Sequence, residues 1–157
     1  MKRKLRTAAL SALIAAVFLA GTASAAFAAQ PLAIHIEVDE IIAASGEPFA
    51  ASGPAVDAGL VCPSGTVEEL STKVSGPPSG AFSILNVVKR FDCDDASGSF
   101  DVRLVVRLDN ATGETTARWV VVDGTEAYSN LHANGSLVGT PIVLGFSIHD
   151  VYDGMVH

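Results

Sequence analysis

The sequence predicts an all-β fold, a meander of roughly six to eight antiparallel strands that closes into a barrel or folds into a sandwich. Three observations predict it. Apolar and polar residues alternate with a period of two along much of the chain, turn residues separate the alternating stretches, and helical periodicity is nearly absent. A sheet of this size must close or fold in two, because exposed strand edges have to be covered.

The chain begins with a segment typical of an export signal. Four Lys and Arg residues precede an apolar run from Ala8 to Ala20, the charge order of a signal peptide. Cleavage fits after either Ala25 or Ala28, each of which ends a small-x-small triplet. We take residues 1–28 as signal peptide and 29–157 as a single β domain. The alternative, a membrane anchor, needs roughly 20 strongly apolar residues, and this run is shorter. We therefore expect a secreted or extracytoplasmic protein that is not inserted in a membrane.

Removal of the signal makes the remaining chain strongly acidic. Six Lys and Arg residues then stand against seventeen Asp and Glu residues, a net charge of −11. Such a chain repels nucleic acid at long range, so we expect no nucleic-acid partner.

Four stretches alternate clearly enough to predict strands. In the first, Ile34, Ile36 and Val38 share one face while His35 and Glu37 share the other. Less regular strands are expected over residues 66–74 and 82–91. The clear stretches are residues 32–39, residues 101–108, a strand carrying Ala117, Trp119 and Val121, and a last strand carrying Ile142, Leu144, Phe146, Ile148 and Tyr152.

Turn residues punctuate these strands. Clusters of Gly, Pro, Asn, Asp and Ser occupy residues 75–80, 94–98, 109–113 and 123–124. Gly allows positive φ, and Asn and Asp bond their own backbone, so each cluster favours a chain reversal. Residues 46–59 are expected to form a long loop or an irregular edge segment.

The only two cysteines, Cys62 and Cys93, indicate a disulfide, because an even count is typical of exported proteins. Closing this loop is expected to stabilise the fold by about 3–4 kcal/mol. The competing interpretation is a pair of metal-binding thiolates, but no further Cys or suitably spaced His completes a zinc site.

The second half of the chain resembles a known family. The stretch 91–100, followed by 119–128, resembles small secreted bacterial proteins of the allene oxide cyclase-like and dirigent-like β-barrel group. Their pattern places Gly-Thr-Gly-x-Tyr after a strand, and a Gly-rich turn and another strand follow. This sequence departs from the pattern at Glu126, where a turn that requires positive φ would be strained, and at Ser129, Asn130 and Asn134. The matching residues are Gly124, Thr125, Tyr128, Leu131, Gly135 and Gly139.

The resemblance implies an eight-stranded antiparallel closed barrel over residues 29–157, with an apolar interior and often a homo-oligomeric assembly. Proteins of this group hold a reactive small molecule inside the barrel while it cyclises or couples. No catalytic set of either family maps onto residues of this chain.

Other groups of polar residues have simpler interpretations. Asp92, Asp94, Asp95 and Asp101 invite a calcium site, but their spacing does not fit an EF-hand loop and a solvated hairpin turn explains them better. The histidines form no His-x-His pair; His35 and His149 should lie on polar strand faces. Hydrolase-elbow and phosphate-loop signatures do not occur, so we predict no metal and no cofactor.

Trp119 and Tyr128 are the aromatic candidates for a ligand pocket, although core packing is the favoured interpretation of both. Three functions are compatible with these features. The first is a non-catalytic exported barrel that binds a small apolar molecule or another protein. The second is an isomerase or cyclase like the resembled families, which needs a polar group deep in a cavity. The third is a structural envelope protein with a filled interior and an oligomer interface. The candidates for the polar group are Glu37, Glu40, Asn86 and Arg90.

Overall fold

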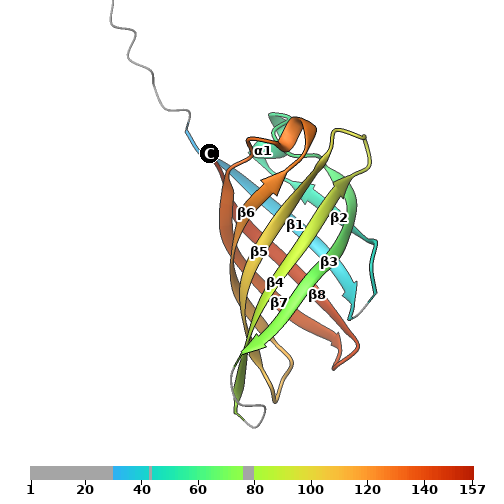
Figure 1. The fold of residues 1–157 in the computed structure, drawn as a ribbon, viewed down its shortest axis with the longest axis vertical. Coiled ribbons are helices and arrows are strands. Elements are labelled where there is room, and N and C mark those ends of the chain that lie inside the picture. Colours follow the sequence, from blue (N-terminus) through green and yellow to red (C-terminus); the bar gives the residue numbers. More distant parts are fainter. Residues whose placement is uncertain (1–29, 43, 76–79) are drawn as a thin grey trace, which may run out of the picture.

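The computed structural model describes residues 30–42, 44–75 and 80–157 and confirms a closed antiparallel barrel of eight strands. Each strand pairs with the next in sequence, and β8 returns to β1 (Figure 1). The short helices α1 (Pro54–Asp57) and η1 (Glu126–Tyr128) lie in loops. The predicted signal peptide, residues 1–28, lies outside the described residues. The strands are β1 (Leu32–Ile41), β2 (Glu47–Ser52), β3 (Ser64–Ser75), β4 (Phe82–Cys93), β5 (Ser99–Asp109), β6 (Thr115–Gly124), β7 (Ala133–Val143) and β8 (Ser147–Val156).

The pairing of β1 with β8 closes the barrel. It runs the whole length of β1, from Leu32 opposite Val156 to Ile41 opposite Ser147. The predicted alternation of β1 is confirmed, because Ile34, Ile36 and Val38 are at most 4% exposed. With every other residue of each strand pointing inward, the strands bury one apolar face and leave the polar face in water.

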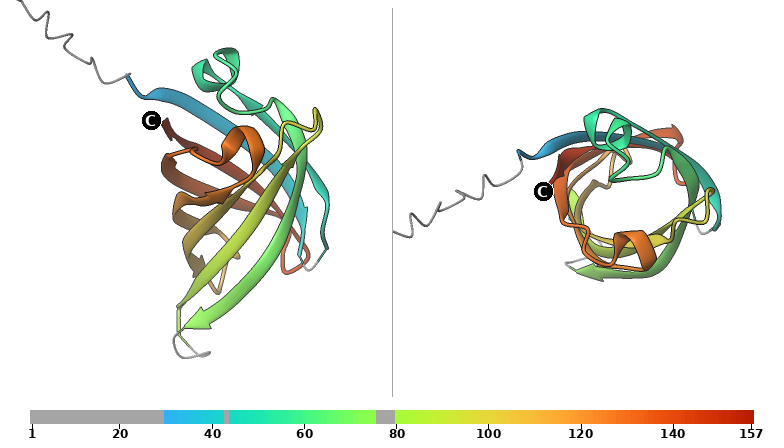
Figure 2. Two further views of the ribbon diagram at one scale, coloured as in Figure 1. Left: turned by 45° about the horizontal axis from the view of Figure 1, so that its top comes forward. Right: turned by 90° about the horizontal axis from the view of Figure 1, so that it is seen from above.

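The two ends of the barrel differ. At the upper end in Figure 1, α1, η1 and the turn between β4 and β5 lie over the rim, as the view from above shows (Figure 2). Just inside this end, Phe91 packs against three aromatic rings, those of Phe49, Phe100 and Tyr152, at centroid distances of 5.1–5.6 Å. All four rings are buried, at 3% exposure or less. The connections from β1 to β2, from β5 to β6 and from β7 to β8 lie at the opposite end.

The predicted last strand was wrong. Residues 142–152 are divided between β7 and β8 by a turn around Gly145, which has a φ of +72°. Leu144 and Phe146, expected on an apolar strand face, are 65% and 57% exposed beside this turn. The sequence pattern hid the turn because Leu144 and Phe146, although exposed, are spaced two residues apart like the buried residues of a strand.

The long loop or irregular edge segment predicted over residues 46–59 is instead β2, which pairs with both β1 and β3, followed by α1. β2 is short and carries one fully buried residue, Phe49, so its alternation is too brief to recognise in the sequence.

In the described ranges, no helix has the length and apolar character that crossing a bilayer requires.

Candidate functional site

A cavity of about 350 Å³ opens inside the barrel at the end opposite α1. Its volume lies at the lower end of the range of small-molecule sites, roughly 300–1,000 Å³. Most of its wall comes from inward-facing aliphatic residues of β3, β4, β5 and β7. The main apolar wall residues are Val67, Leu85, Val87, Leu104, Val106 and Leu137.

Three charged residues meet at this cavity. The alternation of β1 brings Glu40 onto the same inner face as Val38, and that of β8 does the same for Asp150 beside Tyr152. Lys89 lies on the inner face of β4 between Val87 and Phe91. Because β4 does not pair with β1 or β8, the lysine reaches across the interior to both carboxylates.

All three hydrogens of the Lys89 ammonium group make hydrogen bonds to carboxylate oxygens. Its Nζ donates to Oε1 and Oε2 of Glu40 at 2.5 and 2.6 Å and to Oδ2 of Asp150 at 3.3 Å. The side chains of Lys89, Glu40 and Asp150 are 8%, 16% and 6% exposed. An ammonium has three hydrogens, so these three contacts account for all of its donors.

Two polar atoms nearby remain without a partner. Among the residues that the structure describes, Oδ1 of Asp150 and the hydroxyl of Tyr152 are buried and accept or donate no hydrogen bond. Asp150 lines the cavity, whereas the Tyr152 side chain lies deeper, among the aromatic rings. A buried polar atom without a partner is costly, so each such atom in a folded protein calls for an explanation, for example a functional role.

Burial governs the titration of this cluster. It raises the pKa of the Glu40 and Asp150 carboxyls, and the nearby Lys89 charge offsets this only in part. Burial acts to lower the pKa of Lys89, but the oxygen atoms of Tyr152, Glu40 and Asp150 outweigh it, so that the pKa is raised and the lysine stays charged. Burial also raises the pKa of Tyr152, which stays a neutral phenol.

The structure separates the residues proposed for a polar site. Glu40 lines the cavity, as one of the candidates for a deep polar group. Glu37 and Asn86 are exposed on outer strand faces, and Arg90 pairs with Asp101 outside the barrel at 2.8 Å.

Trp119 and Tyr128 are both buried, at 4% exposure each, but neither is among the residues that line the cavity. The Trp119 indole donates to the carbonyl of Ser136 at 3.0 Å and lies 6.3 Å from the Tyr152 ring. Tyr128 packs against Phe100 at the α1 end. Both side chains therefore belong to the packed part of the interior.

Lys89 and Asp150 were missed by sequence reasoning. The signal was present, because each charge replaces an apolar residue within an alternating inner face, between Val87 and Phe91 in one case and between Ile148 and Tyr152 in the other. A charge in that phase points into the barrel.

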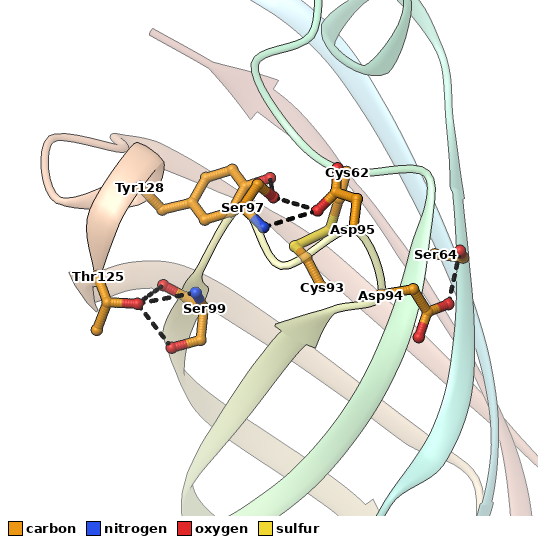
Figure 3. The surroundings of a disulfide bond; sticks show 9 residues. All are labelled: Cys62, Ser64, Cys93, Asp94, Asp95, Ser97, Ser99, Thr125 and Tyr128. Atoms are coloured by element: carbon orange, nitrogen blue, oxygen red, sulfur yellow. Dashed lines mark hydrogen bonds between the residues drawn. A yellow bond between two sulfur atoms is a disulfide. The ribbon is translucent and has the colours of Figure 1, made fainter.

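The disulfide and the Asp-rich turn lie at the opposite end (Figure 3). Cys62 and Cys93 are bonded, as predicted. Asp95 accepts bonds from the backbone N–H and the hydroxyl of Ser97, which lower its pKa, and Asp94 accepts a bond from Ser64 at 2.8 Å. The Asp residues of this turn therefore accept hydrogen bonds that stabilise the turn. Within the described ranges, no three His, Cys, Asp or Glu side chains come together in a group that could hold a metal ion.

Glu126 begins η1, in the turn where a positive φ was expected to cause strain. Its φ is +50°, in the left-handed region that glycine prefers, so the expected strain at this position is confirmed. The turn is retained by bonds between Thr125 and Ser99 and by the Tyr128 hydroxyl, which bonds Ser97 at 2.7 Å (Figure 3).

Comparison of the chain with protein-family models, with curated proteins and with solved structures finds no match in any of the three. The fold is therefore established by the strand pairing, and any function has to be argued from the cavity and the charges in it.

Proposed function

We propose that this protein is an exported barrel that binds a small, largely apolar molecule in the cavity opposite α1. The observation that carries the proposal is the pairing of an aliphatic wall with an unsatisfied polar atom, Oδ1 of Asp150. Ligand sites typically combine these two features, apolar contact for affinity and a few polar groups for orientation.

The buried charges support a binding role over a structural one. Replacing a buried ion cluster by apolar side chains of similar volume is often neutral or stabilising. A barrel with only a structural function has no need of Glu40, Lys89 and Asp150 in its interior, and we expect it to be filled.

A second candidate function is an isomerase or cyclase of the allene oxide cyclase or dirigent type. It is favoured by one observation, the ionisable groups at the base of an apolar cavity, and by the resemblance of residues 91–100 and 119–128 to those families. A neutral phenol and a carboxyl of raised pKa are suited to proton transfer. Fold resemblance alone does not transfer an activity, so binding is the primary proposal.

Native mass spectrometry of the exported protein, before and after denaturation, tests the binding proposal. We expect a noncovalent adduct that denaturation releases, and the same spectrum reports any homo-oligomer. Val106→Phe, which fills the cavity wall, should abolish the adduct. Val105→Phe is the matched control, because Val105 is the neighbouring residue on the outer face and is 50% exposed. An adduct that survives Val106→Phe, or a wild-type protein that takes up no compound from an apolar extract, would contradict the proposal.

A further inference from the structure

The charges around the cavity favour one chemical class of ligand, an inference that rests on the proposed binding function. Four carboxylate residues line the cavity, and Lys89 is the one basic residue among the described lining. The carboxylates are Glu40, Glu47, Glu69 and Asp150. Even with Lys89 paired, the cavity carries an excess of negative charge, which attracts a cation and repels an anion.

Lys89 offers nothing to an anionic ligand. Its three N–H bonds are directed at Glu40 and Asp150. A carboxylate or phosphate group on a ligand would have to displace one of these buried partners and leave it without a cation, which is costly. The lysine therefore neutralises part of the cluster and does not serve as an anion site.

Asp150 provides a carboxylate oxygen without a hydrogen-bond partner. Its Oδ2 faces Lys89, while its Oδ1 has no partner within the described residues. Oδ1 lies over the Cα of Gly139, between the side chains of Thr115 and Ile148, where a Cβ at residue 139 would collide with all three. Thr115, Ile148 and Asp150 all line the cavity, so the unpartnered oxygen lies directly behind its wall, and a ligand reaches it by a small rotation of the carboxylate.

We propose that the ligand is a small apolar molecule with a protonated amine at one end, and that its ammonium group binds Oδ1 of Asp150. The hydrocarbon part lies against Val87, Leu104 and Val106. The ammonium supplies both the donor and the positive charge that this carboxylate lacks, and charge-assisted hydrogen bonds are the stronger kind. The raised pKa of the Asp150 carboxyl agrees with this, because a buried carboxylate short of positive charge takes up either a proton or a cation.

Three probes of one chain length separate the ligand classes: n-octylamine, n-octanol and octanoate. Isothermal titration of the exported protein at about pH 7, below the micelle concentrations, keeps the amine protonated and the acid ionised. We expect n-octylamine to bind about tenfold tighter than n-octanol, and octanoate to bind most weakly. Asp150→Asn should lower the n-octylamine affinity several-fold and the n-octanol affinity much less, so that most of the preference for the amine is lost. Asp153→Asn, on the outer face of β8, is the control and should change neither.

The outcomes are distinguishable. If n-octanol binds as tightly as n-octylamine, the amine inference is overturned while binding of an apolar ligand stands. If none of the three probes binds, both fail. If Asp150→Asn binds n-octanol but keeps the preference for the amine, Asp150 is not the amine site. The ranking of the probes on the unchanged protein decides the ligand class even if that variant does not fold.

Discussion

A lysine inside a small barrel must find acceptors for its three hydrogens and a partner for its charge. Lys89 finds them in Glu40 and Asp150, from strands on the other side of the interior. The reverse also holds, because each carboxylate depends on Lys89 to remain ionised in a buried position. Removing the lysine leaves two buried carboxyls without a cation.

Lys89→Met tests this dependence. Breaking a buried ion pair from one side costs about 3 kcal/mol or more, so we expect the free energy of unfolding to fall by about that amount at about pH 7. Both carboxyls have folded pKa values above their ordinary ones, so folding favours their protonated forms and stability rises as the pH falls through the folded pKa. The cost of Lys89→Met should therefore shrink toward about pH 4.

Urea unfolding at the two pH values measures this. Lys73→Met, which removes an exposed lysine of β3, is the control and should change stability little at either pH. A cost of Lys89→Met that grows as the pH falls would contradict the account.

His35 on the outer face also has a raised pKa, but its protonated form is the charged one. Its Nδ1 contacts Asp153 at 2.7 Å and its Nε2 contacts Glu37 at 3.1 Å, and these two hydrogen bonds raise its pKa. Both ring nitrogens must donate, so the pair of bonds requires the protonated imidazole. A group whose pKa is raised on folding stabilises below its unfolded pKa of about 6.5, and this contribution is lost as the pH rises through the folded pKa.

We therefore expect His35→Gln to lower the free energy of unfolding at about pH 5.5, by less than about 1 kcal/mol because the pair is exposed. At about pH 8.5 the substitution should have little effect. Thermal unfolding at both pH values measures the difference, with His132→Gln, an exposed histidine, for comparison. An equal loss at both pH values would show that protonation of His35 does not contribute to the stability of the fold.

At the scale of elements, the disulfide ties the segment that follows α1 to the end of β4. Cys62 and Cys93 are 31 residues apart, and the loop they close contains all of β3 and nearly all of β4. The longest strands of the barrel are thus covalently closed at the α1 end, while the cavity lies at the other end.

The double substitution Cys62→Ala and Cys93→Ala should lower the free energy of unfolding by about 3–4 kcal/mol, because the unfolded chain gains the entropy of an open loop. Reduction of the unsubstituted protein should have the same effect in urea unfolding. Ligand binding below the unfolding transition should persist, since the bond is remote from the cavity. Loss of binding in a folded double variant would indicate that the two ends are coupled.

At the scale of the whole molecule, the internal disulfide is compatible with a protein outside the cytosol. The disulfide agrees with export without proving it. The signal peptide over residues 1–28 therefore stays a prediction, and the mass of the exported chain tests it directly.

Expressed in full in a bacterial host, the chain should be recovered from the extracytoplasmic fraction with its first residue at Ala26 or Ala29 and its mass two hydrogens below that of the free thiols. Val17→Arg places a charge in the apolar run and should prevent export. Recovery of full-length protein from the cytosol in both cases would refute the signal peptide.

The sequence by itself determined the fold class and much of the topology. Alternation in residues 32–39 and 101–108 identified strands. One face of each strand is buried and the other is in water, so apolar and polar side chains alternate along the sequence. The two cysteines left one pairing. The same local pattern could not separate β7 from β8 or reveal β2, because exposed apolar residues such as Leu144 and Phe146 imitate a buried face, and β2 is too short to show a period.

Only the tertiary structure decided the site. Lys89 is 49 residues from Glu40 and 61 residues from Asp150 along the chain, and no local pattern brings the three together. Closure of the barrel does, because it turns three inner faces toward one interior and makes a charge on any of them a neighbour of the others. It also decides which aromatic residues fill that interior and where space remains, since packing depends on the side chains that face each other across the barrel.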